Sequence, residues 1–186
     1  MPQYAVVAYV RDPVGHFLEE LRREVYPHHA HLPAHLTILP PRQLLGSQTD
    51  AAQLQAIQAL QTLCCEIEPF EVTLGNVASF ALVTPTVYLE IEHGAQRMRE
   101  LHDRLNLPLF QQDEPWPYEP HLTVVKRTTL SEAETAFADA RARWAQYHGP
   151  RRVLVDQLTF VREGDDGGWV DVAPVRLGRS VPQASR

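Results

Sequence analysis

The sequence predicts a mixed α and β fold in which one β-α-β-α-β pattern occurs twice, as two lobes with a cleft between them. Three observations indicate this arrangement. A His-x-Thr motif in a short apolar run occurs at His35 and again at His121. Each copy follows a proline-rich loop and precedes a helix with a capping signature. The surrounding elements recur in the same order at a spacing of about 82 to 86 residues. We therefore expect one domain over residues 1–178, with repeated halves at about 3–80 and 86–163.

The first half begins with a strand over residues 4–10, which ends at Asp12-Pro13, an N-cap followed by proline at the first helical position. The next helix has apolar side chains at three- and four-residue spacing and charged side chains that we expect to face water. The apolar positions are Phe17, Leu18, Leu21 and Val25, and the charged ones are Glu19, Glu20, Arg22 and Arg23.

The strand at His35 is expected to end at Pro40-Pro41, because prolines remove two ladder donors. A helix over residues 49–67 follows, with Asp50 and Gln53 as an approximate capping box. The half closes with a strand over residues 70–80, in which Gly75-Asn76 predicts a turn or bulge.

The second half repeats this order after Thr84-Pro85. We expect a strand over residues 87–92, a helix, a long loop over 108–120, the strand at His121, a helix opened by a capping box from Ser131 to Glu134, and a strand over 152–162. Residues 169–177 predict a hairpin partner, and the tail at 179–186 is expected to be disordered. The predicted buried positions of the two helices are Met98, Leu101, Leu105, Phe137, Ala140 and Trp144.

Each motif should present an imidazole beside a hydroxyl. Side chains alternate along a strand with period two, so His35 and Thr37 share one face, and His121 and Thr123 share another. If each lobe sends its motif to the interface, a pseudo-twofold axis brings both pairs together.

Composition narrows the class of protein. The net charge of −6 and the pI near 5.8 argue against a general binder of long nucleic acid, which needs a broad basic surface. The only cysteines, Cys64 and Cys65, are adjacent and cannot join distant parts of the fold. We find no signal-peptide pattern and no apolar run of about 20 residues. We expect a cytoplasmic monomer with no membrane association and no obligate protein partner.

Two histidines across a cleft suit a reaction in which one proton is removed while another is delivered. In-line displacement at phosphorus has that requirement. One imidazole would take a proton from the attacking water or hydroxyl, and the other would protonate the leaving oxygen. The two threonine hydroxyls would bind the non-bridging phosphate oxygens. This scheme requires no metal and no other cofactor.

With these motifs the chain resembles the two-histidine (2H) phosphoesterase superfamily, which includes 2′-5′ RNA ligases and RNA 2′,3′-cyclic phosphodiesterases. The resemblance covers roughly residues 3–177 and also draws on the strands at 72–75 and 87–90. It implies an α+β fold of two pseudo-symmetric lobes, with antiparallel sheets lining a central cleft. It also implies metal-independent hydrolysis of 2′,3′-cyclic phosphate ends of RNA or nucleotides to 2′-phosphates, with reversible 2′-5′ joining in some members.

By this resemblance His35 and His121 are the acid and base, and Thr37 and Thr123 hold the phosphate. The resemblance leaves open which histidine has which role, and we favour His121 as the base and His35 as the acid that protonates the leaving group. RNA-acting relatives often have arginine five residues after the second histidine, a position occupied here by Lys126, with Arg127 next. Strand alternation places Arg127 on the face of His121.

Other candidates for substrate binding are Arg42, Trp116 and Tyr118. The aromatic residues of the second loop, Phe110 among them, suit either stacking of a base or anchoring of the loop to the core. For His28, His29 and His31 a metal site is conceivable. No cysteine or carboxylate completes a recognisable ligand spacing, so we interpret this segment as a solvated loop.

Two classes of function fit these features. One is a phosphodiesterase whose substrate is an RNA end, a cyclic nucleotide or a cyclic phosphate of an ADP-ribose type. The other is a protein of the same fold that binds nucleotides or RNA ends without turnover. The sequence does not decide among these substrates, and turnover of a cyclic nucleotide distinguishes the two classes.

Overall fold

The computed structural model describes residues 2–27, 32–45, 50–81, 83–110, 114–126, 128–164 and 168–178. The predicted tail at 179–186, the loop histidines His28, His29 and His31, and Arg127 lie outside these ranges. The elements in chain order are β1 (Tyr4–Tyr9), α1 (Pro13–Val25), β2 (His35–Arg42), α2 (Asp50–Cys64), β3 (Phe70–Ser79), β4 (Val87–His93), α3 (Ala95–Leu105), the 3-10 helix η2 (Pro108–Phe110), β5 (His121–Val125), α4 (Leu130–Ala145), β6 (Arg152–Val155), β7 (Gln157–Glu163) and β8 (Trp169–Arg176).

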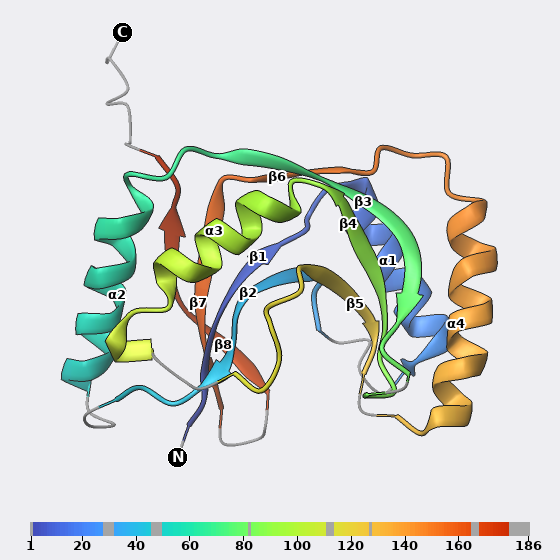
Figure 1. Ribbon diagram of the computed structural model, residues 1–186, viewed down its shortest axis with the longest axis horizontal. Coiled ribbons are helices and arrows are strands. Elements are labelled where there is room, and N and C mark those ends of the chain that lie inside the picture. Colours follow the sequence, from blue (N-terminus) through green and yellow to red (C-terminus); the bar gives the residue numbers. More distant parts are fainter. Residues whose placement is uncertain are drawn as a thin grey trace, which may run out of the picture.

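The strands form two antiparallel four-stranded sheets, as expected for the α+β fold. The first has the order β2-β1-β7-β8 and the second the order β5-β4-β3-β6. The two strands that carry His-x-Thr, β2 and β5, are each the edge strand of their sheet, and they pack against each other in the middle of the molecule (Figure 1).

Each sheet contains strands from both halves of the sequence repeat. Strand β3 closes the first half, yet it pairs with β4 and β6 in the second sheet. Strand β7 closes the second half and pairs with β1 and β8 in the first sheet. The predicted single strand over residues 152–162 is therefore wrong: the chain leaves one sheet and enters the other at Asp156. Alternation along a sequence reports which face is buried and not which partner a strand has, so it misses this change.

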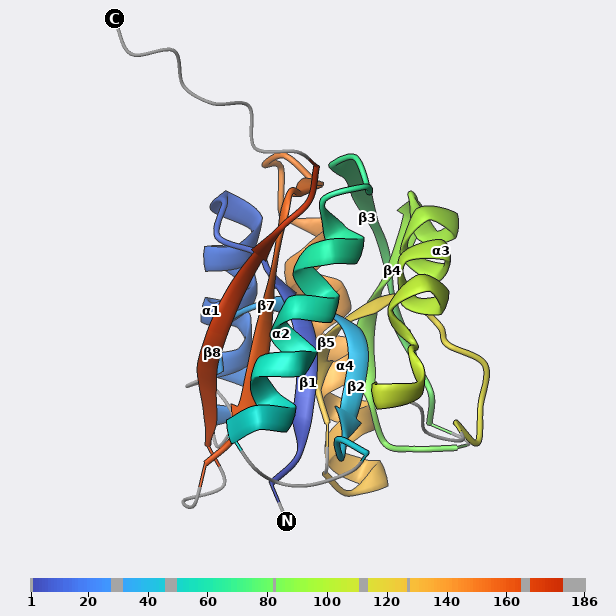
Figure 2. The ribbon, with the colours of Figure 1, turned by 90° about the vertical axis from the view of Figure 1, so that its left-hand side faces the viewer.

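The helices follow the same reciprocal arrangement. Helix α1 packs against α4 and β5, and α3 packs against α2 and β2, so each of these two helices contacts the motif strand of the other half. Figure 2 shows α2 in front of the first sheet and α3 to the right of β2. No helix in the described ranges is both long and apolar enough to cross a lipid bilayer.

Local signals explain most element boundaries. The Asp12 side chain accepts a hydrogen bond from the Gly15 N–H and caps α1, as predicted. Opposite Glu90, β3 has the two residues Gly75 and Asn76, which is the predicted bulge. The capping box of α4 is formed by Thr129 and Glu132, not by Ser131 and Glu134, because the helix begins at Leu130.

The expected end of the first motif strand at Pro40-Pro41 is also wrong, since β2 continues to Arg42. The strand is at a sheet edge, where the missing N–H of proline leaves no ladder partner unsatisfied. The register between β1 and β2 shifts between Tyr4 and Val6, which accommodates the two prolines.

One buried cluster joins both sheets and all four α-helices. It includes Leu36 and Ile38 of β2, Leu122 of β5, and Trp144 of α4. The indole N–H of Trp144 donates to the carbonyl of Gly75 at 2.8 Å, so the bulge in β3 is satisfied by the core.

Gly15 lies where helix α1 comes close to the backbone that follows β1, and a substitution there tests how much this close approach contributes to stability. A Cβ at this position would lie 1.9 Å from the carbonyl oxygen of Val10, a backbone atom that cannot rotate away. We expect Gly15→Ala to lower the free energy of unfolding by about 1–3 kcal/mol, as overpacked sites do. Helix propensity alone predicts that Gly15→Ala raises the free energy of unfolding by about 1 kcal/mol. The sign of the measured change therefore shows which of the two effects is larger. Urea denaturation measures it, and exposed His16→Ala on the same helix is the control, with a change within about 0.5 kcal/mol.

Candidate active site

The pleat of β2 and β5 sets the side chains of both motifs. Leu36 and Leu122 are fully buried, whereas the histidine and threonine on either side of each are half-buried. His35 lies opposite Tyr9 in the register of β1 and β2, and His121 lies opposite Glu90 in that of β4 and β5. The predicted shared face of histidine and threonine is therefore present in both strands.

Both imidazoles are held by the same local contact. His35 donates from Nδ1 to the carbonyl of Pro33 at 2.8 Å, and His121 donates from Nδ1 to the carbonyl of Glu119 at 2.6 Å. A carbonyl oxygen can only accept, so Nδ1 must carry a proton in each ring. Nε2 is then the nitrogen that exchanges a proton with a ligand. The proline-rich loops before the motifs supply these two carbonyls.

The two histidines interact although they belong to different sheets. A positive charge on His121 contributes to a lower pKa for His35. The strands that carry them are in contact. The tertiary fold thus brings together the two motifs that are 86 residues apart in the sequence.

The surroundings of His35 strongly favour its neutral form. Burial, together with the smaller effects of the positive charges of Arg22 and Lys126, lowers the pKa of His35 to about 4, and the hydrogen bond to Pro33 opposes this shift. Tyr9 of β1 lies opposite His35, and its hydroxyl donates a hydrogen bond to a carboxylate oxygen of Asp171 in β8.

The surroundings of His121 disfavour its protonated form less than the surroundings of His35 do. Burial, followed by the charge of Lys126, lowers the pKa of His121, but the carbonyl and the carboxylate of Glu119 both raise it. The resulting shift is smaller than that of His35. The rings of Phe80 and Tyr88 stack on each other, with their centroids 4.1 Å apart. Both contact the imidazole of His121 edge-on, at centroid distances of 5.4 and 5.2 Å, and these contacts fix its orientation. Sequence reasoning did not identify this aromatic pair.

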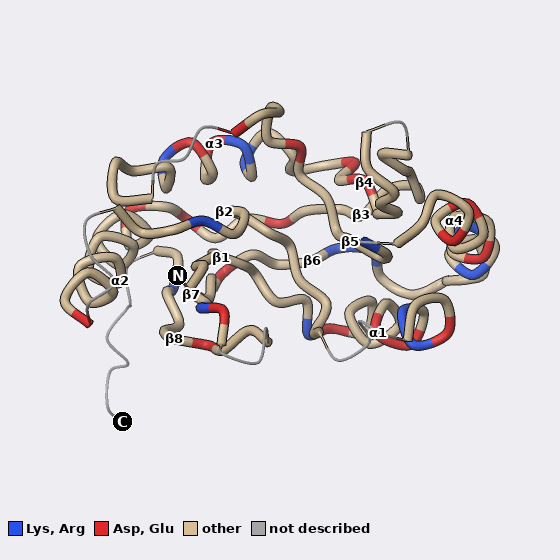
Figure 3. Tube along the Cα trace, turned by 90° about the horizontal axis from the view of Figure 1, so that it is seen from below, with Lys and Arg blue, Asp and Glu red and all other residues tan. Residues whose placement is uncertain are grey.

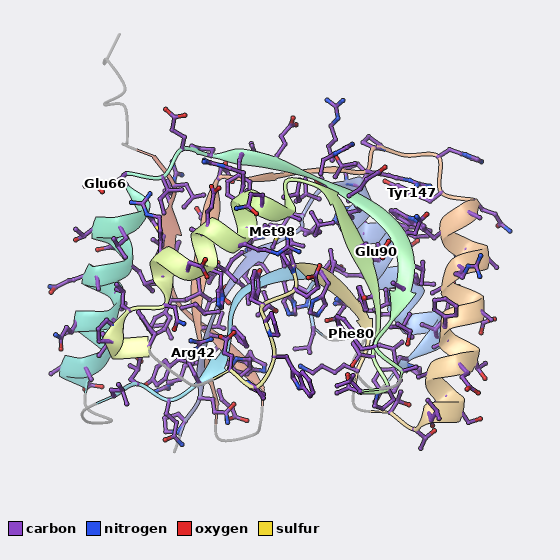
Figure 4. All side chains as sticks on the ribbon, viewed as in Figure 1. Arg42, Glu66, Phe80, Glu90, Met98 and Tyr147 are labelled. Carbon is purple, nitrogen blue, oxygen red and sulfur yellow. The ribbon has the colours of Figure 1, made fainter. Side chains whose placement is uncertain are left out.

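Two cavities lie beside the sheets, and neither His35 nor His121 is among the residues that line them. The first, of about 250 Å³, is lined by Glu119 and by Tyr88 and Glu90 of β4, of which Glu90 lies opposite His121 in the register of the second sheet. The second, of about 300 Å³, is lined by Tyr9, the residue opposite His35, and by Arg11. Figure 4 shows Glu90 on β4 in the second sheet and Phe80 just after the end of β3.

Arg22 is the main residue that sequence reasoning misplaced. It was expected on the water-facing side of its helix, but only 4% of its surface is exposed. Its guanidinium donates to the carbonyls of Leu32 and Pro33 at 2.9 and 3.2 Å, and to the carbonyl of Thr123. Its spacing of four from Leu18 places it on the apolar stripe, and this signal was available in the sequence.

Arg42 is buried and hydrogen-bonded inside the protein, which argues against the predicted role in substrate binding. It is 2% exposed, and its guanidinium donates to Pro40, Asn106, Phe110 and Glu114. Arg42 thereby links the end of β2 to the segment that follows α3 (Figure 4). An arginine with these donors occupied inside the protein cannot bind an external phosphate.

Tyr118 anchors the second loop, which is one of the two roles considered for it. Its hydroxyl donates to the carbonyl of Thr37 at 2.7 Å, and its ring stacks on buried His102 at 4.1 Å. Trp116 is 64% exposed and remains a prediction as a base contact. Lys126 is exposed just after β5 and acts electrostatically on both histidines. Arg127 lies outside the described residues and also remains a prediction.

Comparison with solved structures shows the same fold in other proteins. The crystal structure of Escherichia coli LigT complexed with ATP aligns with a TM-score of 0.60 at 15% identity, over 96% of this chain and all of that chain. A Thermus thermophilus structure aligns with a TM-score of 0.57 at 16% identity, again over 96% of this chain and all of that one.

Sequence comparison gives the family. A putative phosphoesterase of Bacillus thuringiensis is 28% identical over 160 residues, which are 86% of this chain and 87% of the relative. A putative phosphoesterase of Bacillus cereus is 27% identical over 159 residues, with the same coverage. The family model for the 2′-5′ RNA ligase superfamily matches residues 10–167, a segment that contains both His-x-Thr strands and most of the chain. The chain therefore belongs to the 2′-5′ RNA ligase superfamily of two-histidine phosphoesterases.

Proposed function

We propose that the protein is a phosphodiesterase that opens 2′,3′-cyclic phosphate ends of RNA or nucleotides to 2′-phosphates. The observation that carries this proposal is the matched pair of imidazoles. Each is fixed through Nδ1 to a carbonyl two residues earlier, and the two interact electrostatically across the contact between β2 and β5. Each ring thereby has Nε2 available for proton transfer.

In the proposed reaction, Nε2 of one neutral imidazole takes a proton from water as the water oxygen attacks phosphorus. The bond between phosphorus and O3′ breaks, and the protonated second imidazole gives its Nε2 proton to O3′. The products are a 2′-phosphate and a 3′-hydroxyl. Thr37 and Thr123 donate hydrogen bonds to the non-bridging oxygens, where charge accumulates. A 5′-hydroxyl in place of water would give 2′-5′ joining with the same two histidines.

The electrostatics favour His35 as the base and His121 as the acid. The base must be neutral, and the pKa of His35 is lowered to about 4. The acid must hold a proton, and Glu119 opposes the loss of the proton from His121. This reverses the assignment made from the sequence, which had no information on the charges around each ring.

Two further observations support a nucleotide-sized substrate. Crystal structures of E. coli LigT contain phosphate, 3′-AMP, ATP or NADP+, so this fold accommodates small phosphate-bearing ligands in that protein. In Figure 3, basic and acidic positions alternate along α1, α3 and α4, with ion pairs such as Arg143–Glu24, instead of forming one basic face over the described residues. A long duplex would need such a face.

The decisive experiment is turnover of a 2′,3′-cyclic nucleotide by the protein and by its histidine variants. We expect His35→Ala and His121→Ala each to lower kcat by about 10²–10⁴-fold, because each removes one proton transfer. The double variant should lose less than the product of the two single losses, since either single change already disables the concerted step. Thr37→Ala and Thr123→Ala serve as comparisons and should lose less.

Binding of a cyclic nucleotide without turnover would instead support a non-catalytic role for the same site. Near-normal turnover by either histidine variant would contradict the two-histidine mechanism.

The pH dependence of kcat/KM should be bell-shaped with an acidic optimum. Activity rises as His35 loses its proton, with a midpoint near pH 4, and falls as His121 loses its proton, with a midpoint below the ordinary value of 6.5. The residual activity of His35→Ala should lack the rising limb, and that of His121→Ala should lack the falling limb. The opposite pattern would restore the assignment made from the sequence.

Turnover should survive removal of metal ions. The two imidazoles supply both proton transfers and the threonines bind the phosphate oxygens, so the scheme leaves no step to a metal. We expect kcat after EDTA treatment and gel filtration to match that of the untreated protein. A loss of activity that added Zn²⁺ or Mn²⁺ restores would show that a metal takes part.

A further inference from the structure

Helices α1 and α3 are related by the internal repeat, and each places a buried polar side chain against the motif strand of the other half. When the two helix sequences are aligned with a shift of 80 residues, Leu18 corresponds to Met98, Leu21 to Leu101 and Arg22 to His102. All six residues are buried. Arg22 donates to the carbonyl of Thr123 in β5, and Nδ1 of His102 donates to the carbonyl of Ile38 in β2 at 2.9 Å.

Arg22 contacts the loop that precedes the first motif and the backbone of the second motif at once. One guanidinium nitrogen donates to the carbonyls of Leu32 and Pro33, and the other donates to the carbonyl of Thr123. The same Pro33 oxygen accepts from Nδ1 of His35. A planar fork with fixed donor directions therefore connects the carbonyl that orients His35 to the backbone of the residue two positions after His121.

The positive charge of Arg22 is buried and close to His35. Burial lowers the pKa of Arg22 to about 10, so it stays charged at neutral pH, and Glu19 on the same helix partly offsets this effect. The other charged groups that act on His35 are Lys126 after β5 and His121 in β5, while Tyr9 faces it from β1 as a neutral phenol.

The equivalent position on the other side has a different character. His102 stacks on Tyr118, and its Nε2 lies 3.5 Å from a carboxylate oxygen of Glu114. Neither His102 nor any arginine is among the groups that shift the titration of His121. The repeat is therefore symmetric in its backbone contacts and asymmetric in its charge.

We propose that Arg22 is a positioning residue for the two-histidine centre: its guanidinium sets the spacing of the two motif strands and places a buried positive charge beside His35, which adds to the effect of burial in favouring His35 as the proton acceptor of the pair. The kinetic part of this inference rests on the proposed phosphodiesterase function, whereas the part about charge concerns His35 alone.

The test compares two pairs of variants. Arg22→Met removes the charge and keeps the length of the side chain, and Arg22→Lys keeps the charge but loses the fork. Arg42→Met and Arg42→Lys are matched controls, because Arg42 is equally buried and also binds backbone carbonyls, but does not touch either motif's histidine or threonine. The measurements are the titration midpoints of His35 and His121 by NMR, kcat with a 2′,3′-cyclic nucleotide, and Tm.

The proposal makes a separate prediction for each variant. In Arg22→Met the midpoint of His35 should rise by about one pH unit, while that of His121 stays in place. In Arg22→Lys the midpoint of His35 should stay low and kcat should fall about tenfold, because an ammonium cannot span both carbonyls. The Arg42 variants should lower Tm and leave both midpoints unchanged.

An Arg22→Met protein that loses Tm as Arg42→Met does, with an unchanged His35 midpoint, would overturn the role of the charge. If Arg22→Met does not fold, Arg22→Lys decides: full kcat, equal to that of Arg42→Lys, would overturn the positioning role. If the unmodified protein turns over no cyclic nucleotide, the proposed function fails, and the His35 midpoint still decides the effect of Arg22.

Discussion

Both histidine strands are edge strands, and an edge strand leaves a row of backbone groups with no partner in its own sheet. Side chains from other elements supply the missing partners here. Tyr118 donates to Thr37, His102 to Ile38, and Arg22 to Thr123. Because these donors come from α1, α3 and the loop before β5, the backbone of each motif is held by elements outside its own sheet. The geometry of the site depends on satisfying these carbonyls.

The exchange of strands and helices between the halves strengthens this dependence. β3 and β7 each cross to the sheet of the other half, and α1 and α3 each pack on the other motif strand. A relative movement of the two sheets would therefore disturb the ladders and the core together. In the proposed reaction two imidazoles act on one phosphate, which requires a fixed separation between them, and this interleaving restricts that separation.

Proton transfer in opposite directions needs two histidines that are alike in geometry and unlike in charge. The matched Nδ1 contacts to Pro33 and Glu119 provide the likeness. Burial lowers the pKa of both rings, and the difference comes from the charges around each: Arg22 lowers the pKa of His35 further, whereas the carboxylate of Glu119 raises that of His121. A duplicated backbone can thus support an acid and a base once its neighbouring side chains diverge.

By itself the sequence determined the repeat, the order of strands and helices up to residue 152, and the four motif side chains, since these depend on local periodicity and on residues close along the chain. His35 and Thr37 face one way because Leu36 is buried between them. Only the tertiary structure decided which sheet each strand joins, and it divided residues 152–162 between two sheets. It also buried Arg22 and Arg42 in networks whose partners are distant in sequence. The proposed acid and base roles depend on desolvation and on charges carried by α1 and by the segments flanking β5, and such effects act through space and leave no periodic pattern in a sequence.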